Sequence, residues 1–192
     1  MSSSSTHPTI DRRDPDFLPL VVLNTLLGGK FTSRINLNLR ERHGYTYGAT
    51  SRVSGRLGPG PFSIAAAVAT ESTGAAVREV LGELERIRAE PVSAEELEET
   101  RRYVAGVFPY SSQTVGDIAK RLEALAVYGL PDDHYDTYLA RVAAVETDEL
   151  LAIARRHLVP ERIAIVAVGP AAEVAPQLAD LGPIEVGGNG GS

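Results

Sequence analysis

The segment Leu26–Gly48, LLGGKFTSRINLNLRERHGYTYG, decides how this chain is expected to fold. Apolar residues leading into it are dense enough for a buried helix, and the pair Gly28 and Gly29 is expected to end that helix. A shorter helix is predicted over residues 31–42, and the alternating pattern of a strand begins at Tyr45. The segment therefore predicts two helices, a turn and a strand in immediate succession.

The remaining residues extend this pattern into a mixed domain. Residues 62–70, FSIAAAVAT, predict a returning strand that makes a hairpin with the first one, because glycine and proline fill the turn between them. Four or five helices are predicted over residues 72–157, one of them starting at the capping box Ser93–Glu96. Residues 162–168 predict a strand that is apolar on both faces and hence central. We expect an α+β fold of two layers, a mainly antiparallel sheet covered by helices.

Composition limits the classes of function. The chain has 192 residues, 43% of them hydrophobic, which suits one core. A net charge of −6 argues against a nucleic-acid partner, since such binding rests on clustered Lys and Arg. The sequence has no cysteine, and no run of about 18 apolar residues that would indicate a membrane span. We therefore expect no disulfide and no membrane partner, with the cytoplasm as the favoured location and the periplasm left open.

The two ends of the chain differ in composition from its middle. Residues 1–9, MSSSSTHPT, are polar and predict a disordered or tag-like end, although Thr9 and Ile10 could be the stub of a strand. Residues 187–192, GGNGGS, predict a flexible glycine-rich tail. Residues 10–186 are therefore expected to form one domain.

One long run carries a resemblance to a known family. RRDPDFLPLVVLNTLLGGKFTSRINLNLRERHGYTYGA resembles the C-terminal, inactive half of the pitrilysin and insulinase-like zinc peptidases, in particular bacterial relatives of mitochondrial processing peptidase. The likeness continues through residues 60–106 and the late IAIVAVG strand. In that family a catalytic half binds zinc through a His-x-x-Glu-His helix, and a homologous second half closes over it. The resemblance implies that this chain is the second half, bound as a heterodimer or neighbouring domain to a catalytic partner, with an extended peptide between them.

The histidines do not supply a zinc site of this kind. They are His7, His43, His134 and His157. The His-x-x-Glu-His motif needs two histidines on one helical face, and no two of these lie within a helical turn of one another. Residues 132–136, DDHYD, have metal-ligand types, but capping and solvation at a helix entry explain them better. No metal or cofactor is expected in this chain, and the zinc is expected in the partner.

The resemblance gives a role to Arg40 and Tyr47, which lie seven residues apart. The family's second half places such a pair in the shared chamber near the scissile bond. A guanidinium can donate to peptide carbonyls, and a tyrosine hydroxyl can donate to the oxyanion that develops during hydrolysis. Without the resemblance, Arg40 would be interpreted as a surface ion pair with Glu41 or another neighbour. Tyr47 would be interpreted as a strand aromatic packed on the core.

Three neighbouring features have two interpretations each. Gly28 and Gly29 could end a helix, which their position favours, or form part of the substrate-binding wall beside Arg40 and Tyr47. Arg34 could pair with a carboxylate or contribute to the chamber. His43, next to a glycine in a turn, could be a ligand, although a solvated turn residue is the commoner case.

Two hypotheses of function follow. The first is the non-catalytic, substrate-binding half of a zinc metallopeptidase, inactive alone, which clamps extended peptides against a His-x-x-Glu-His partner. The alternative is a scaffold or interaction subunit with no peptidase role. A free-standing hydrolase is disfavoured because cysteine and a Gly-x-Ser-x-Gly elbow are absent.

The resemblance also bears on the start of the sheet. Second halves in the family begin with one or two strands before the segment that corresponds to residues 12–16. Only about ten residues precede this segment here, so the sheet is expected to lack its first strands.

Overall fold

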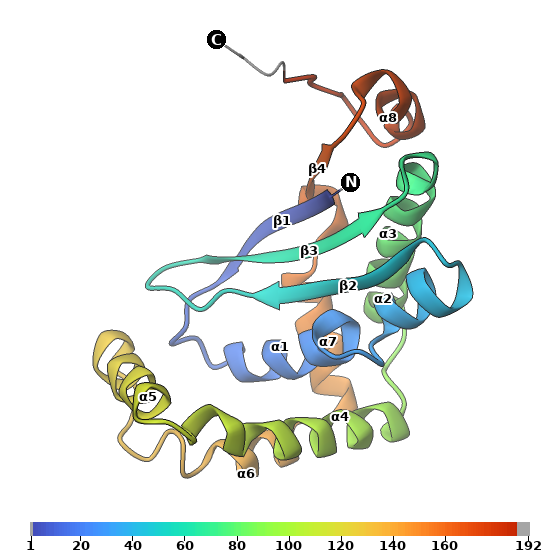
Figure 1. Cartoon of the computed structure of the whole chain (residues 1–192). Coiled ribbons are helices and arrows are strands. Elements are labelled where there is room, and N and C mark those ends of the chain that lie inside the picture. Colours follow the sequence, from blue (N-terminus) through green and yellow to red (C-terminus); the bar gives the residue numbers. More distant parts are fainter. Residues whose placement is uncertain (1, 188–192) are drawn as a thin grey trace.

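A computed structural model describes residues 2–187, with side chains from Ile10 onward. It confirms the α+β class, with one four-stranded sheet in which every neighbouring pair of strands is antiparallel (Figure 1). The strand order is β2-β3-β1-β4. The strands are β1 (Ser2–Ile10), β2 (Thr46–Val53), β3 (Gly60–Val68) and β4 (Ala164–Val168). The tail predicted at residues 187–192 lies, apart from Gly187, outside the described residues.

The helices follow the predicted order. The α-helices are α1 (Phe17–Asn24), α2 (Arg34–Asn36), α3 (Thr73–Ala89), α4 (Ala94–Val107), α5 (Val115–Tyr128), α6 (Tyr138–Ala144), α7 (Thr147–His157) and α8 (Ala171–Leu178). The shorter elements are the π-helical η1 (Thr25–Gly29) and η2 (Leu37–Arg42) and the 3₁₀ turns η3 (Thr70–Ser72), η4 (Phe108–Ser112) and η5 (Pro160–Arg162). The capping box at the start of α4 is confirmed, because the Ser93 hydroxyl accepts from the Glu96 N–H and the Glu96 carboxylate accepts from the Ser93 N–H.

The N-terminal residues differ from the prediction. Ser2–Ile10 forms strand β1 where a disordered or tag-like end was expected, and the proposed stub at Thr9 and Ile10 is the end of this strand. β1 lies between β3 and β4 and pairs with both, so its backbone groups have partners on two sides. The short stretch before Asp11 is therefore long enough to supply a strand, and the described sheet has no gap at this position.

Strand β4 also differs from the prediction. Its apolar sequence indicated a central strand, but β4 lies at an edge of the described sheet. Val166 and Val168 are 54% and 65% exposed. The apolar residues of β4 therefore do not make it a central strand. One of its faces is partly buried, and the other, which carries Val166 and Val168, is exposed.

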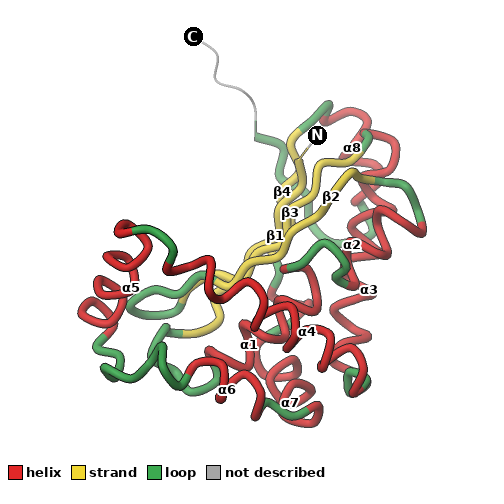
Figure 2. The backbone as a smooth tube through the Cα atoms, turned by 60° about the horizontal axis from the view of Figure 1, so that its bottom comes forward, coloured by secondary structure: helices red, strands yellow, loops and turns green. Residues whose placement is uncertain are grey.

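One hydrophobic core lies between the sheet and the helices. Along β3 the alternate residues Phe62, Ile64, Ala66 and Val68 are buried, as the period of a strand requires. Helices α1, α3, α4 and α7 pack on this side (Figures 1 and 2). Side chains that are fully or almost fully buried there include Leu20, Leu23, Leu27, Ile35, Leu84, Ile87 and Leu150.

The opposite face of the sheet is left open along much of its length. In the register of the sheet, Thr50 of β2 lies opposite Ala65 of β3. Ala65 and Val166 of β4 lie on either side of the same residue of β1. Thr50, Ala65 and Val166 therefore lie on one face of the sheet. Thr50 and Val166 are exposed. Because the residues along this face are small or exposed, it offers a flat surface, which we call the open face.

Candidate functional site

Tyr47 projects from a β-bulge at the start of β2. The pairing of β2 with β3 shifts between Thr46 and Ala49, so that Tyr47 and Gly48 together lie opposite Ala67. A bulge of this kind re-aims a side chain. In a regular strand Tyr47 would share the buried face of Ala49, but its side chain is 99% exposed. The interpretation of Tyr47 as a core aromatic is therefore wrong, and its hydroxyl faces solvent.

Asn36 holds this bulge in place. It is buried, and its side chain replaces a neighbouring strand: Oδ1 accepts from the Ala49 N–H at 2.8 Å, and Nδ2 donates to the Ala49 carbonyl at 2.7 Å. Nδ2 also lies within hydrogen-bond distance of the Ser33 hydroxyl and the Lys30 carbonyl. The backbone immediately after Tyr47 is thereby fixed to the helical segment that precedes it.

Arg40 lies in η2, in the turn of helix that leads to the bulge. Gly44, at φ +66°, closes the turn, and its N–H donates to the Arg40 carbonyl at 3.1 Å. The guanidinium lies 4.1 Å from the centroid of the Phe31 ring, and its Nη1 is 3.2 Å from a carboxylate oxygen of Glu41. The predicted ion pair with Glu41 is thus present. Within the described part of the chain the other Arg40 N–H groups have no recorded acceptor, so they remain available as donors.

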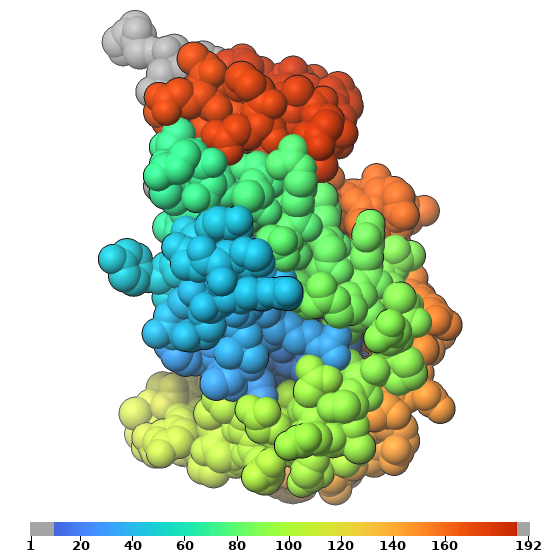
Figure 3. All heavy atoms as spheres, turned by 90° about the vertical axis from the view of Figure 1, so that its right-hand side faces the viewer, coloured from blue at the N-terminus to red at the C-terminus, as the bar shows by residue number. Residues whose placement is uncertain are grey.

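Two ion pairs fix the same segment to α4. Arg34 donates from Nε and Nη2 to both carboxylate oxygens of Glu96 at 2.8 Å, which confirms that Arg34 pairs with a carboxylate. These bonds lower the pKa of Glu96. The buried Lys30 reaches Glu99 at 2.9 Å. Figure 3 shows the residues of this segment, in blue and cyan, lying against α3 and above α4.

On its other side η2 contacts α3. Asn38 Nδ2 donates to Glu79 at 2.9 Å and to the buried Glu83 at 2.7 Å. His43 stacks on Tyr45, with ring centroids 5.0 Å apart, and its Nε2 is 3.6 Å from Glu79. His43 is therefore a half-buried turn residue rather than a fully solvated one. The helix that carries Arg40 is held from two directions.

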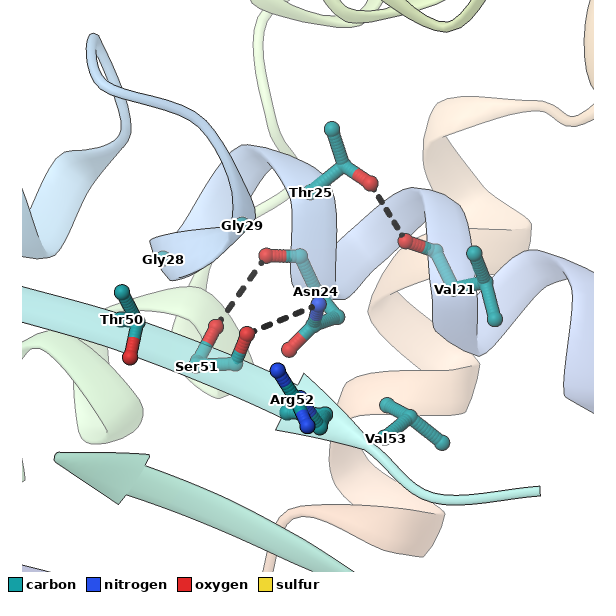
Figure 4. A pocket seen from close by; sticks show the side chains of 9 residues that line it. All are labelled: Val21, Asn24, Thr25, Gly28, Gly29, Thr50, Ser51, Arg52 and Val53. Carbon is teal, nitrogen blue, oxygen red and sulfur yellow. Dashed lines mark hydrogen bonds between the residues drawn. The ribbon is translucent and has the colours of Figure 1, made fainter. Parts of the chain in front are cut away.

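Gly28 and Gly29 line a pocket beside β2 (Figure 4). It has a volume of about 330 Å³ and is lined by Val21, Asn24, Thr25, Gly28, Gly29, Thr50, Ser51, Arg52 and Val53. Neither glycine has a positive φ, and both lie inside η1, so they do not act as left-handed caps beyond a helix end. Their backbone instead lies close to β2, where Asn24 and Ser51 exchange hydrogen bonds of 3.3 Å. Strand β2 therefore has this pocket at one end and Tyr47 at the other.

Gly28 is required by this close approach. A Cβ at Gly28 would lie 2.5 Å from the Ser51 hydroxyl and 2.8 Å from its Cβ, closer than real Cβ contacts. We expect Gly28→Ala to lower the free energy of unfolding by about 1–3 kcal/mol, as overpacking does. Gly82, in α3, has nothing within 4 Å of an added Cβ. Gly82→Ala should instead stabilise by about 0.5–1 kcal/mol, and urea denaturation of both variants checks the two signs.

Metal-ligand side chains do not gather in the described part of the chain. No group of three or more His, Asp or Glu side chains there has the arrangement of a metal site. Within residues 132–136, His134 is 7% exposed, so it is buried where solvation was predicted. No described helix combines the length and apolarity needed to cross a membrane.

Sequence reasoning missed the two residues that shape this site. Asn36 is a polar residue between the buried Ile35 and Leu39, and an asparagine inside an apolar helical pattern is the signal that could have revealed it. Phe31, whose ring lies under Arg40, gives no signal of its own in the sequence. Arg40 and Tyr47 themselves lie in one turn-forming unit, as predicted, while Gly28 and Gly29 lie farther along β2.

Comparisons with known proteins identify the family to which this chain belongs. Residues 6–104 match the family model described as "Peptidase M16 inactive domain". An uncharacterized zinc protease of Streptomyces coelicolor is 25% identical over 163 residues, which are 85% of this chain and 35% of that protein. This chain thus spans about a third of the length of the curated relative.

Solved structures show the same fold. A peptidase M16 inactive domain from Pseudomonas fluorescens superposes with a TM-score of 0.79 and 26% identity, over 88% of this chain and 42% of that one. A protease from Helicobacter pylori superposes with a TM-score of 0.77 and 15% identity, over 85% of this chain and 39% of that one. This chain therefore shares the fold of these two proteins and spans less than half the length of each.

Proposed function

We propose, since this chain belongs to the Peptidase M16 inactive-domain family, that it is the non-catalytic, substrate-binding half of a zinc-dependent peptidase. It would act with a catalytic half of the same family that carries a His-x-x-Glu-His helix. The zinc belongs to that partner, where it would activate the attacking water. This chain supplies binding and orientation for an extended peptide.

The observation that carries this proposal is the placement of Tyr47. A tyrosine hydroxyl that is wholly exposed, on a bulge fixed by a buried asparagine, has no role in the core of this domain. It is well suited to donate to an oxyanion in a second protein domain. Arg40, held over Phe31, supplies further donors at the same end of β2 for peptide carbonyls.

The open face provides room for an extended peptide. Beyond the bulge at Tyr47 and Gly48, its exposed residues along β2 and β4 are Thr50, Arg52, Ala164, Val166 and Val168, and none of these is aromatic or acidic. Such a surface can lie against a peptide backbone without selecting one side chain. Gly28 and Gly29 would extend the binding wall along the edge of β2.

Reconstitution tests this function. The chain would be mixed with the His-x-x-Glu-His subunit encoded in the same genome, and cleavage of an extended fluorogenic peptide would be followed. We expect no cleavage by this chain alone, cleavage by the pair, and loss of that cleavage with a zinc chelator. A pair that associates but cleaves no peptide would favour the scaffold role instead.

A further inference from the structure

A second group of polar residues lies away from the features described above, where the loop before α1 meets α5 and the α5–α6 loop. In Figure 1 this region lies below the tip of the β2–β3 hairpin, and Tyr128 at the end of α5 donates to the Gly55 carbonyl in that tip at 3.1 Å. We call its central residues the Arg12–His134–Arg141 cluster. The aromatic rings around them are those of Phe17, Tyr128, Tyr135 and Tyr138.

The two arginines of this cluster lack a carboxylate partner. The Arg12 guanidinium lies 4.3 Å from the centroid of the Phe17 ring, and no ion pair is recorded for it within residues 10–187. Arg141 Nη2 lies 3.3 Å from His134 Nδ1 and 3.4 Å from the His134 carbonyl. Burial lowers the pKa of Arg12, and the nearby charge of Arg141 acts in the same direction. Two cations thus lie near one another, and neither forms an ion pair with a carboxylate within residues 10–187.

His134 adds a buried donor. Arg141 can only donate, so Nδ1 of His134 accepts and the imidazole proton is on Nε2. Nε2 is buried and has no hydrogen-bond partner in the described part of the chain. A buried N–H without an acceptor costs free energy, so an acceptor supplied by a ligand would stabilise this arrangement. Asp133 is the acidic residue whose charge acts on His134, but it forms no recorded ion pair with either arginine among the described side chains.

We infer that the Arg12–His134–Arg141 cluster binds a small oxyanion, either a carboxylate or a phosphate group. Two guanidiniums offer planar forks of donors that match such groups, and the Phe17 ring lies against the Arg12 guanidinium. The bound anion would neutralise the charges of Arg12 and Arg141 and accept from the unpaired imidazole N–H. This inference does not depend on the proposed peptidase role.

Thermal unfolding with and without phosphate tests the site. At constant ionic strength, replacing chloride by phosphate at about tenfold its Kd should raise the Tm by about 3–6 °C. Arg141 donates to the buried His134, so the Tm of Arg141→Gln in chloride is measured as its own baseline, and from that baseline the rise should be lost. Arg162→Gln, an exposed arginine in η5, is the matched control and should keep it. Acetate in place of phosphate shows whether a carboxylate suffices.

Two results would overturn the inference. One is a Tm that does not respond to phosphate or acetate beyond the chloride control. The other is an equal response in Arg141→Gln, which would mean that the salts act on the whole surface rather than at this cluster. A shift of the His134 imidazole N–H signal in the NMR spectrum on adding phosphate, absent in Arg141→Gln, would support the site independently of stability.

The cluster also predicts a pH dependence of stability. Burial, Arg141 and Arg12 lower the pKa of His134 below its ordinary value of 6.5. At low pH the unfolded chain therefore binds a proton on His134 more readily than the folded chain does. The free energy of unfolding thus falls as the pH drops below about 6.5. In chloride, His134→Gln should lose part of the fall in Tm between pH 7.5 and 5.5. Sulfate, whose charge is constant over this range, should reduce the same fall in the unaltered chain.

Discussion

Tyr47→Phe is expected to lower kcat/KM of the assembled peptidase by about 100-fold while leaving the Tm of this chain unchanged. The hydroxyl contacts nothing in this domain, because the side chain is 99% exposed, so its removal should not affect folding. Loss of one donor to a developing oxyanion costs about 10²–10³ in rate. The loss should appear in kcat, since the oxyanion exists only in the transition state. Steady-state kinetics of the reconstituted pair measure it.

Arg40→Ala is expected to have a related but smaller effect, about 10–100-fold in kcat/KM, mainly through KM. Its donors would hold peptide carbonyls, and a hydrogen bond to a charged group contributes about 1.5–3 kcal/mol. Arg42→Ala, in the same η2 segment, and Tyr110→Phe, another exposed tyrosine, are the matched controls and should keep full activity. Full activity in both Arg40→Ala and Tyr47→Phe would contradict the assignment of this site.

Asn36→Leu is expected to have the largest effect on stability. Leucine has a similar size but leaves the N–H and carbonyl of Ala49 without their partners. Each unsatisfied buried group costs about 1–3 kcal/mol, so the free energy of unfolding should fall by about 2–5 kcal/mol. Below the lowered Tm, the released bulge should also misplace Tyr47. We therefore expect a loss of activity comparable to that of Tyr47→Phe in protein that is still folded.

Asn24→Ala is the matched control for this prediction. Asn24 also bonds to β2, but its amide reaches the Ser51 carbonyl at 3.3 Å from a half-buried position. It should cost less stability and, because it does not hold the bulge, lower the activity of the pair much less than Asn36→Leu. Denaturant unfolding and peptide cleavage on the same samples separate the two effects. Equal behaviour of the two asparagine variants would show that Asn36 has no special role in fixing the bulge.

The period of apolar residues was enough to predict most helices and the hairpin, but not the direction of Tyr47. Alternation from Tyr45 through Ser51 places Tyr47 on the core side, whereas the bulge adds one residue and turns it outward. Bulges depend on a tertiary partner, here Asn36, and a local pattern does not contain that information. The resemblance indicated a role for Tyr47 that the alternation alone contradicted.

The positions of β1 and β4 were also beyond the local sequence. The serine-rich residues before Thr6 have no pattern that predicts a strand. They form one because their backbone pairs with β3 on one side and with β4 on the other. For Ile165–Val168 the apolar content was correctly interpreted as a strand, but the number of strands beyond it is a property of the whole sheet. Likewise, burial of His134 follows from the packing of the α5–α6 loop, which composition alone does not specify.

Cross-linking from position 47 shows whether a bound peptide lies against this end of β2. A photoreactive aromatic amino acid would replace Tyr47 in the reconstituted pair. In a second, matched variant it would replace Tyr103 on α4. Each variant would then be irradiated in the presence of a labelled substrate peptide. We expect position 47 to label the peptide, excess unlabelled substrate to suppress this labelling, and position 103 to give none. Labelling that is absent from position 47, or equal at both positions, would contradict a substrate-binding role for this end of β2.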